Sequence, residues 1–321
     1  MADKKLQIAL YWGAACGGCD VAVLDTNEFI LDVAAVADIR MWPIAADGKY
    51  KDIEAMADGE LDLAIFNGGV RNSENEHIAQ LLRQKSKLLI AFGSCAYMGG
   101  IPGLANLTSR EKIMETAYLR NPSIEWGNRV VPQPETSLNG KHLELPRFYR
   151  RVYKLDQVVD VDYYIPGCPP QPDRVRETLL AVVKGELPPK GSVVGAFDHA
   201  LCEDCPRTKN EKKVKKFYRP WEIMADPDTC LLEQGVLCCG VATRSGCGVR
   251  CPTSGIPCRG CYGPAPGVVD QGAKLASAVA SIVDSKDPDE IQEILAGLPD
   301  FTSFAYRYGV AASLLQRSYR Q

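Results

Sequence analysis

Cysteine is the residue type in this sequence with the greatest capacity for chemistry. Of the 321 residues, 13 are cysteines, and several of them stand in CxxC pairs. The first residues run directly into an apolar LQIALYW segment without a secretory leader, and no stretch approaches the ~18 consecutive apolar residues of a membrane span. We therefore expect a cytoplasmic chain, in which thiols stay reduced and paired cysteines indicate metal or redox chemistry.

A first group of four cysteines follows three expected strands. The motifs are CGGC after the first strand, GSCA after a second and PGCPP after a third, and their cysteines are Cys16, Cys19, Cys95 and Cys168. Loops at the carboxyl ends of parallel strands meet at one edge of the sheet. Four thiolates converging there fit a 4Fe–4S cluster or a structural zinc.

Two alternatives explain less of this first group. A thioredoxin-type dithiol would use the CGGC pair but would leave Cys95 and Cys168 without a role. A flavin or nucleotide phosphate could bind the glycine-rich loop after the first strand. That loop, WGAACGGCD, has neither a GxGxxG motif nor the lysine of a P-loop.

A second group of nine cysteines is bracketed by the pairs CEDC and CRGC. Its members are Cys202, Cys205, Cys230, Cys238, Cys239, Cys247, Cys251, Cys258 and Cys261. One four-thiolate zinc site would leave five of them idle, and two zinc ions would use eight. The same ligand sets serve two zinc ions or two four-iron clusters. The wide spacing of the pairs and the Gly/Pro-rich loops between them favour the larger clusters.

The elements that must position these cysteines alternate in the first part of the chain. Short apolar runs alternate with amphipathic stretches, which predicts a doubly wound parallel α/β sheet. We expect strands at 6–12, 38–45, 61–66, 87–92 and 158–165, and helices at 20–35, 72–86 and 172–186. The segment 99–157 fits this pattern poorly and is interpreted as an insertion with one short helix.

The composition and the apolar periodicity of the sequence change after residue 186. The segment 187–267 is rich in proline and glycine, has little apolar periodicity, and holds the second cysteine group. A segment this long and irregular needs something other than an apolar core to order it, and bound metal is the obvious candidate. Helical periodicity resumes at 273–284 and 288–297. We therefore expect two domains, 1–186 around the first group and 187–321 around the second, with closing helices.

Composition sets limits on other functions. The chain is 46% hydrophobic and 24% charged, which is typical of a globular protein. Its 37 Lys and Arg against 40 Asp and Glu give a net charge of -3, with no overall signal for nucleic acid or membrane binding.

The ordered cysteine motifs resemble those of the small subunit of nickel–iron hydrogenases. So do GGVRNSENEH, after the strand expected at 61–66, and LLEQGVLC later in the chain. The resemblance covers nearly the whole chain and is greatest for the cytosolic methyl-viologen-reducing type, which does not reduce the deazaflavin coenzyme. It implies a flavodoxin-like first domain, an irregular cluster domain, and three 4Fe–4S clusters in line. It also implies an oxidoreductase subunit that relays electrons from hydrogen, without catalytic residues of its own.

The resemblance also implies which cysteines bind which cluster. The proximal ligands are Cys16, Cys19, Cys95 and Cys168, the medial ones are Cys247, Cys251, Cys258 and Cys261, and the distal ones are Cys202, Cys205, Cys230 and Cys238. Many family members hold a three-iron medial cluster on three cysteines, and Cys251 supplies a fourth ligand here. Cys239 is left over, although it and Cys238 are interchangeable by spacing. An HxxC motif makes His199 an alternative to Cys205.

Partners follow from the same resemblance. The nickel–iron centre is expected on a separate large subunit in a hetero-oligomer, and the acceptor is expected to be an iron–sulfur or flavin protein, such as a heterodisulfide-reductase-type complex. The basic segment 207–219 is either a solvated loop or a docking patch for that acceptor. The alternatives are a complex I-type or membrane-hydrogenase small subunit, which would not need nine further cysteines, and a zinc-stabilised binding module.

Overall fold

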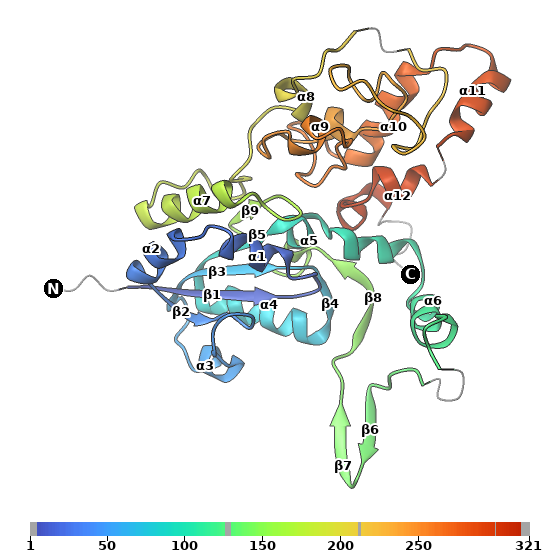
Figure 1. Ribbon diagram of the computed structural model, residues 1–321. Coiled ribbons are helices and arrows are strands. Elements are labelled where there is room, and N and C mark those ends of the chain that lie inside the picture. The colour runs from blue at the N-terminus through green and yellow to red at the C-terminus, as the bar shows by residue number, and fades with distance from the viewer. Residues whose placement is uncertain (1–4, 126–129, 211–212, 299, 316–321) are drawn as a thin grey trace.

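The first half of the chain folds around a five-stranded parallel sheet. The structure is a computed structural model that describes residues 5–125, 130–210, 213–298 and 300–315 (Figure 1). The strand order is β2-β1-β3-β5-β9, and every neighbouring pair is parallel. The strands are β1 (Leu6–Trp12), β2 (Ala37–Met41), β3 (Leu61–Asn67), β5 (Ser86–Phe92) and β9 (Tyr163–Ile165). The predicted parallel α/β sheet is thus confirmed.

Successive side chains of each strand point to opposite faces of this sheet, and both faces are buried. In β1, Ala9 and Tyr11 pack into one apolar core, while Ile8 and Leu10 pack into another on the opposite face. The first core is covered by α3 (Tyr50–Glu54) and α4 (Ser73–Lys85), and the second by α1 (Gly18–Leu24), α2 (Phe29–Val36) and α7 (Pro172–Lys184). This two-sided burial explains why the strands are nearly continuous apolar runs.

Two expected elements differ in extent for local reasons. The expected helix 20–35 is divided into α1 and α2, because Asn27 adopts a left-handed conformation (φ 54°) that breaks the helical path. The expected strand 38–45 ends at Met41, because a turn follows in which the amides of Ala45 and Ala46 both donate to the Trp42 carbonyl. Of the strand expected at 158–165, the structure forms only β9, residues Tyr163–Ile165, which pairs with β5.

The insertion 99–157 contains more structure than the one short helix expected. Besides α6 (Arg110–Glu115), it supplies β8 (Phe148–Tyr153), which pairs antiparallel with β4 (Val70–Asn72). It also forms a hairpin of β6 (Glu135–Leu138) and β7 (Lys141–Glu144), which projects away from the body (Figure 1). The Asn139-Gly140 turn, with both φ angles positive, is the sequence signal that predicts such a hairpin.

The cysteine-rich second half has its own core with few regular elements. Its helices are α8 (Leu201–Asp204), α9 (Arg250–Thr253), α10 (Gln271–Ile282), α11 (Pro288–Ala296) and α12 (Phe301–Ala305). The two longer ones fulfil the expectation of helices near 273–284 and 288–297. Cysteines line this core together with Phe217, Leu275 and Val279. None of the helices within the described ranges is both long and apolar enough to cross a bilayer.

The segment after α12 returns to the first half of the chain. The Gly100 amide donates to the Tyr308 carbonyl (2.9 Å), and Gln157 Nε2 donates to the Ala311 carbonyl (2.9 Å). A Cβ on Gly99 would lie 2.4 Å from the Ala311 Cβ, so only glycine allows this approach. The closing segment therefore packs directly against the loop that follows α5 (Gly93–Met98).

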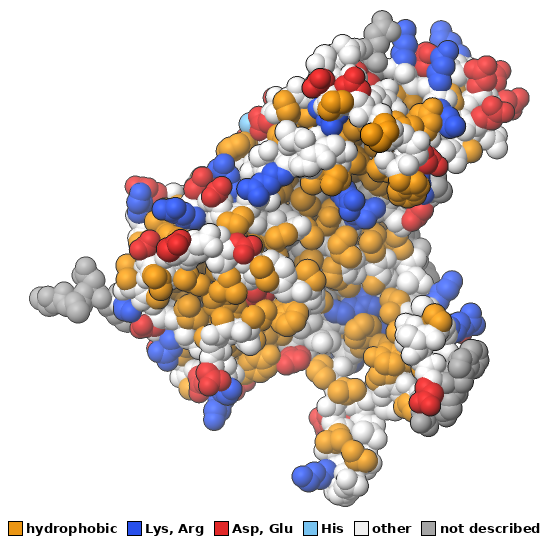
Figure 2. All heavy atoms as spheres, viewed as in Figure 1, with side chains coloured by type: hydrophobic (Ala, Val, Ile, Leu, Met, Phe, Trp, Pro, Cys, Tyr) orange, Lys and Arg blue, Asp and Glu red, His pale blue; other side chains and the backbone are white. Residues whose placement is uncertain are grey.

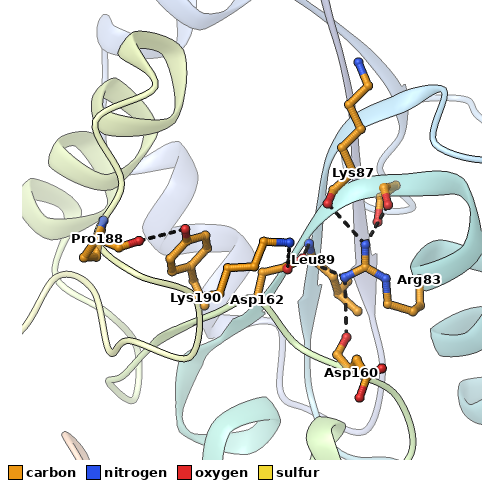
Figure 3. A network of polar contacts seen from close by, with 9 residues as sticks. Arg83, Lys87, Leu89, Asp160, Asp162, Pro188 and Lys190 are labelled. Atoms are coloured by element: carbon orange, nitrogen blue, oxygen red, sulfur yellow. Dashed lines mark hydrogen bonds and ion pairs between the residues drawn. The ribbon is translucent and has the colours of Figure 1, made fainter.

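A polar network around Asp162 anchors the connection between the two halves (Figure 3). One carboxylate oxygen accepts from Arg83 Nη1 (2.6 Å) and from the Leu89 amide (2.8 Å), and the other lies 2.5 Å from Lys190 Nζ. Burial alone would raise the pKa of Asp162, but Lys190, Arg83 and the Leu89 amide together hold it below its ordinary value. The segment after α7 is thereby tied to β5 and β9.

Replacing Asp162 with asparagine should lower the free energy of unfolding at neutral pH by about 2 kcal/mol, because the half-buried Arg83 loses its charged partner. A lowered carboxylate pKa stabilises the fold above the unfolded-state value of about 3.9 and loses this effect as pH falls through the lower folded-state pKa. The difference between wild type and D162N in urea unfolding should therefore shrink below about pH 4.

The matched control is Asp47→Asn, since Asp47 carries the same carboxylate with a fully exposed side chain. This variant should unfold like wild type at every pH. A deficit in D162N that stays constant from neutral to acidic pH would contradict the electrostatic account.

Candidate functional site

The structure brings the first cysteine group to the carboxyl edge of the sheet. Cys16 lies in the loop after β1, Cys19 in α1, Cys95 in α5 directly after β5, and Cys168 in the loop after β9. The Ser94 amide donates to the Gly167 carbonyl (2.7 Å), which joins the second and third of these loops. Cys19 and Cys95 are buried, whereas Cys16 and Cys168 are exposed.

The four thiols of this group interact electrostatically. Burial raises the pKa of Cys19 well above its ordinary value, and Cys95, Cys168 and Cys16 raise it further. Burial, Cys168 and Cys16 raise the pKa of Cys95 to about 12. Thiolates so arranged can coexist only if a cationic centre compensates their charge, as iron or zinc does when it deprotonates its cysteine ligands. The donor set thus fits a bound metal group.

Glycines provide the close approach that this group requires. A Cβ on Gly93 (φ 80°) would lie 2.3 Å from the Cys19 sulfur, and one on Gly100 (φ 57°) would lie 2.4 Å from the Cys95 sulfur. Any other residue would displace these sulfur atoms, and both backbone conformations favour glycine. The glycines next to the cysteines therefore shape the site.

A buried carboxylate supports the same loops. Asp20, in the first turn of α1, accepts hydrogen bonds from Trp42 Nε1 (2.8 Å) and Asn67 Nδ2 (2.9 Å). Burial raises the pKa of Asp20, and the two hydrogen bonds oppose that rise. Asp20 therefore fixes Cys19 relative to the ends of β2 and β3.

Cys247, Cys251 and Cys261 form a second set of interacting thiols. Burial raises the pKa of Cys261 to about 12, and Cys247 and Cys251 contribute to that rise. Cys258 is buried, and its pKa is raised well above its ordinary value by burial and then by Cys238, Cys239 and Cys261. Cys258 thus lies between this set and the next one.

Cys202, Cys230 and Cys238 form a third set. Burial raises the pKa of Cys238 to about 12, and the charges of Cys202 and Cys230 raise it as well. A Cβ on Gly240 would lie 3.1 Å from the Cys202 sulfur. Cys205 follows Cys202 at the end of α8 and packs against the same core as Cys230 and Cys238.

The structure separates the two members of the Cys238-Cys239 pair. Cys238 has an extended backbone, so its side chain and that of Cys239 point in opposite directions. Cys238 lies beside Cys202 and Cys230, whereas Cys239 is 1% exposed and lies near Arg307 and Cys261. His199 is engaged elsewhere: its Nε2 lies 2.8 Å from Asp204 Oδ1, and its ring stacks on Phe197.

A direct hydrogen bond joins the first set to the second. Ser94 Oγ, in the residue next to Cys95, donates to the Cys261 carbonyl (2.6 Å). Tyr308 lies close to both sets: burial raises its pKa, and the neighbouring Cys261 and Cys168 raise it further. No sequence signal pointed to Tyr308, because only the tertiary fold brings the closing segment to this loop.

The assignment of a bound group rests on donor type and electrostatic proximity. Within the described parts of the chain, no three His, Cys, Asp or Glu side chains converge closely enough to hold a single metal ion. Each of the three sets supplies soft sulfur donors, which are the ligands of iron–sulfur clusters and of structural zinc.

Apolar side chains are exposed beside the first set and on the helices that adjoin it. Trp12 and Ile101 are exposed at the loops of Cys16 and Cys95, and Val21 and Leu24 are exposed on α1, the helix that contains Cys19. Leu31 and Val36 are exposed on α2, which ends where β2 begins, at the opposite edge of the sheet. Figure 2 shows hydrophobic side chains gathered over α1, α2 and the middle of this face. An apolar area of this kind is typical of a surface that another protein covers.

Known proteins are similar to this chain over most of its length. The family model described as "NADH ubiquinone oxidoreductase, 20 Kd subunit" matches residues 16–182. The iron–sulfur subunit of the F420-non-reducing hydrogenase of Archaeoglobus profundus is 41% identical, over 97% of this chain and 98% of that protein. A subunit of the F420-non-reducing hydrogenase of Methanothermobacter marburgensis is 38% identical, over 97% of this chain and 96% of that protein.

A solved structure shares the fold. The NiFeSe hydrogenase of Desulfovibrio vulgaris Hildenborough matches with a TM-score of 0.51 and 19% identity, over 82% of this chain and 95% of the matched chain. The full-length likeness to the curated relatives carries the assignment: this chain belongs to the family of iron–sulfur subunits of F420-non-reducing hydrogenases.

Proposed function

We propose that this chain is the electron-relay subunit of a nickel–iron hydrogenase. Electrons from hydrogen oxidation on a separate large subunit would pass through three 4Fe–4S clusters in this chain to an acceptor protein. The observation that carries the proposal is the direct linkage of successive cysteine sets: Ser94, next to Cys95, donates to the Cys261 carbonyl (2.6 Å), and the Cys258 amide donates to the Cys238 sulfur (3.3 Å). A relay needs such adjacent stations, whereas separate structural metal sites do not.

The proposed ligands keep the three sets of four. Cys16, Cys19, Cys95 and Cys168 would bind the proximal cluster, Cys247, Cys251, Cys258 and Cys261 the medial cluster, and Cys202, Cys205, Cys230 and Cys238 the distal cluster. A bound cluster supplies one-electron redox chemistry. This chain's residues hold the sulfur atoms, exclude water from Cys95 and Cys258, and donate hydrogen bonds to sulfur. None of them acts as an acid, base or nucleophile.

The large subunit is proposed to cover the apolar face next to the proximal set. Cys16 and Cys168 are exposed there, and Trp12 at the end of β1 and Val21 and Leu24 of α1 add exposed apolar side chains to the same part of the fold. A partner on this face would exclude water from the proximal cluster and receive the apolar surface. The complex is proposed to be a cytoplasmic hetero-oligomer. Within it, residues 1–186 would form the proximal-cluster domain and 187–321 the medial and distal cluster domain.

Two other functions receive less support. A complex I-type or membrane-hydrogenase small subunit corresponds to the family match over 16–182, but the curated relatives match over 97% of the chain, second cysteine group included. A zinc-stabilised binding module would leave unexplained why the cysteine sets contact one another in sequence. The electron-relay function accounts for both observations.

The acceptor is proposed to dock beside the distal set. Lys209 Nζ donates to the Cys205 carbonyl (3.2 Å), and Phe217 is buried in the core that contains Cys205 and Cys230. Between them, the side chains of Lys213, Lys215 and Lys216 are exposed. Arg207 does not belong to this surface, because it is buried and donates to three carbonyl groups. Lys212 lies outside the described residues.

The native complex, purified without oxygen, should contain about 12 iron and 12 acid-labile sulfide per copy of this chain, beyond the iron of the large subunit. Metal analysis and sulfide assay check this number. Stoichiometric zinc in place of iron would contradict the proposal and favour the binding module.

Cys251→Ser should convert the medial cluster to a three-iron form with its own EPR signal, and an unchanged spectrum would remove Cys251 from the ligands.

The adjacent cysteines offer a matched pair of variants. Cys238→Ser should abolish the distal-cluster EPR signal and lower the iron content by about four, because its sulfur lies beside Cys202 and Cys230. Cys239→Ser makes the same chemical change one residue away and should keep both the signal and the iron. The reverse outcome would exchange the two assignments.

His199→Ala should leave the distal EPR signal intact, because the His199 ring binds the Asp204 carboxylate rather than a cluster. A changed signal would favour His199 as a ligand in place of Cys205.

Reversing Lys213, Lys215 and Lys216 to glutamate should slow electron delivery to the native acceptor about tenfold at low salt, because surface charge acts on the association rate. The effect should fade at high ionic strength, and reduction of a small neutral dye should not change. Asp284, Glu290 and Glu293 lie near Lys215 and Lys216. Their negative charges weaken the attraction of these lysines for the acceptor.

The charge-matched control reverses three exposed lysines on other elements, namely Lys112, Lys141 and Lys184. Stopped-flow measurement of acceptor reduction compares the two triple variants. Equal slowing in both would assign the effect to net charge, and unchanged rates would leave 213–216 as an ordinary solvated surface.

A further inference from the structure

Arg71, in β4, is a buried cation without a counter-charge. It is 6% exposed, and neither Nη1 nor Nη2 has a hydrogen-bond acceptor in the part of the chain that the structure describes. The Phe148 ring lies over the guanidinium, with Cζ 4.4 Å from the ring centroid. A ring face attracts a cation but leaves its N–H groups unpaired. Because an unpaired buried charge is costly, this guanidinium requires an anion.

The backbone around Arg71 is fixed by the start of α4. The Arg71 amide donates to Asn75 Oδ1 (3.2 Å), and the Asn75 amide donates to Asn72 Oδ1 (2.8 Å). Asn75 Nδ2 also donates to the Tyr11 hydroxyl (3.1 Å). The motif GGVRNSENEH therefore holds its arginine in a set position.

The strands on both sides of this arginine are attached to the loops of the first cysteine set. Gly69, before Arg71, exchanges backbone hydrogen bonds with Ala14 in the loop that leads to CGGC (2.9 and 3.0 Å). Val152 in β8 is bonded twice to Asn106, in the segment after α5 (2.7 and 2.9 Å). Figure 1 places β4 and β8 at the carboxyl end of the sheet. Arg71 thus belongs to the side that the large subunit is proposed to cover.

A groove between α6 and β8 leads to the Phe148 ring. Its volume is about 430 Å³, and its apolar walls include Met114, Leu119, Pro132 and Pro134. Phe148 lines this groove and also covers the Arg71 guanidinium. The ring therefore separates the buried cation from a space that can receive a segment of another protein.

The acidic side chains of the groove are already paired. Glu111 lies 3.0 Å from Arg110, and Glu115 lies 2.6 Å from Arg120. Arg147, a further member of the groove wall, is exposed. Figure 2 shows basic side chains over β4 and β8, next to hydrophobic side chains of the same face. The charge of this region thus complements a carboxylate on the partner.

We propose that Arg71 is the receptor for an acidic side chain of the large subunit, which enters the groove and displaces the Phe148 ring from the guanidinium. The inference rests on the proposed function, because it takes the large subunit as the partner on this side. Two parallel N–H groups of a guanidinium match the two oxygens of a carboxylate. Water accepts such hydrogen bonds but does not neutralise the charge, whereas a carboxylate does both and sets the register of the subunits.

The test compares Arg71→Met with Arg150→Met in the hydrogenase complex. Arg150 is an exposed arginine of β8, so its variant makes the same chemical change on the paired strand. R71M should raise the dissociation constant of the two subunits by about thirtyfold or more, because it leaves the partner's carboxylate buried and unpaired. R150M should stay within about twofold of wild type. Anaerobic analytical ultracentrifugation over a dilution series measures both.

A double-mutant cycle tests the partner group itself. Each Asp and Glu of the large subunit is replaced in turn by Asn or Gln and combined with wild type and with R71M. One replacement should weaken assembly with wild type and have little further effect with R71M. If no acidic residue of the large subunit is coupled to Arg71, the inference is overturned.

Measurements on the separate full-length chain exclude other roles of Arg71. R71M should keep its iron and unfold at or above the wild-type temperature, because it removes an uncompensated buried charge. Loss of iron and a lower unfolding temperature would make Arg71 a structural residue. Stabilisation of wild type but not R71M by inorganic phosphate would assign the site to a free anion. Either result overturns the inference, while iron and sulfide in the wild-type complex test the proposed function separately.

Discussion

Burial of the cysteine thiols is the constraint on which the rest of this structure depends. Cys19, Cys95, Cys238 and Cys261 all have pKa values raised first by burial and then by neighbouring cysteines. In the chain alone such thiols stay protonated and neutral, because thiolate charge in a low-dielectric interior must be compensated. Bound iron supplies that compensation, and the energy of binding metal becomes energy of folding. The irregular second half can therefore dispense with extensive secondary structure.

The two halves meet this constraint by different means. In the first half, a regular sheet with two apolar faces brings three loops to one edge, and Gly93 and Gly100 give the sulfur atoms room. In the second half, cysteines themselves line the core: Cys239 and Cys258 are buried among Leu275 and Val279. The first site is thus added to a scaffold that can stand without it, whereas the second sites are part of the core that they organise.

Sequence patterns predicted what local chemistry determines. Runs such as LDLAIF predicted buried strands, and cysteines after strand ends predicted the first set, because parallel strands share an edge. The break at Asn27 and the short pairing of β9 depend on backbone conformation and neighbours that periodicity does not contain. Adjacent Cys238 and Cys239 are equivalent by spacing, and only the extended backbone between them gives them opposite directions. Tyr308 is remote in the chain from Gly100, whose amide it binds, so no motif could connect them.

The two ends of the proposed relay differ in the kind of surface that surrounds them. The first set has two exposed cysteines on a face rich in apolar side chains, which suits a permanent partner that removes water. The third set lies beside exposed lysines, which suit a partner that arrives and leaves under electrostatic guidance. The second set lies between them, joined to the first by the hydrogen bond from Ser94 to the Cys261 carbonyl and to the third by the Cys258 amide, which donates to the Cys238 sulfur. An apolar, lasting contact at one end and a charged, transient contact at the other give the proposed relay its direction through the chain.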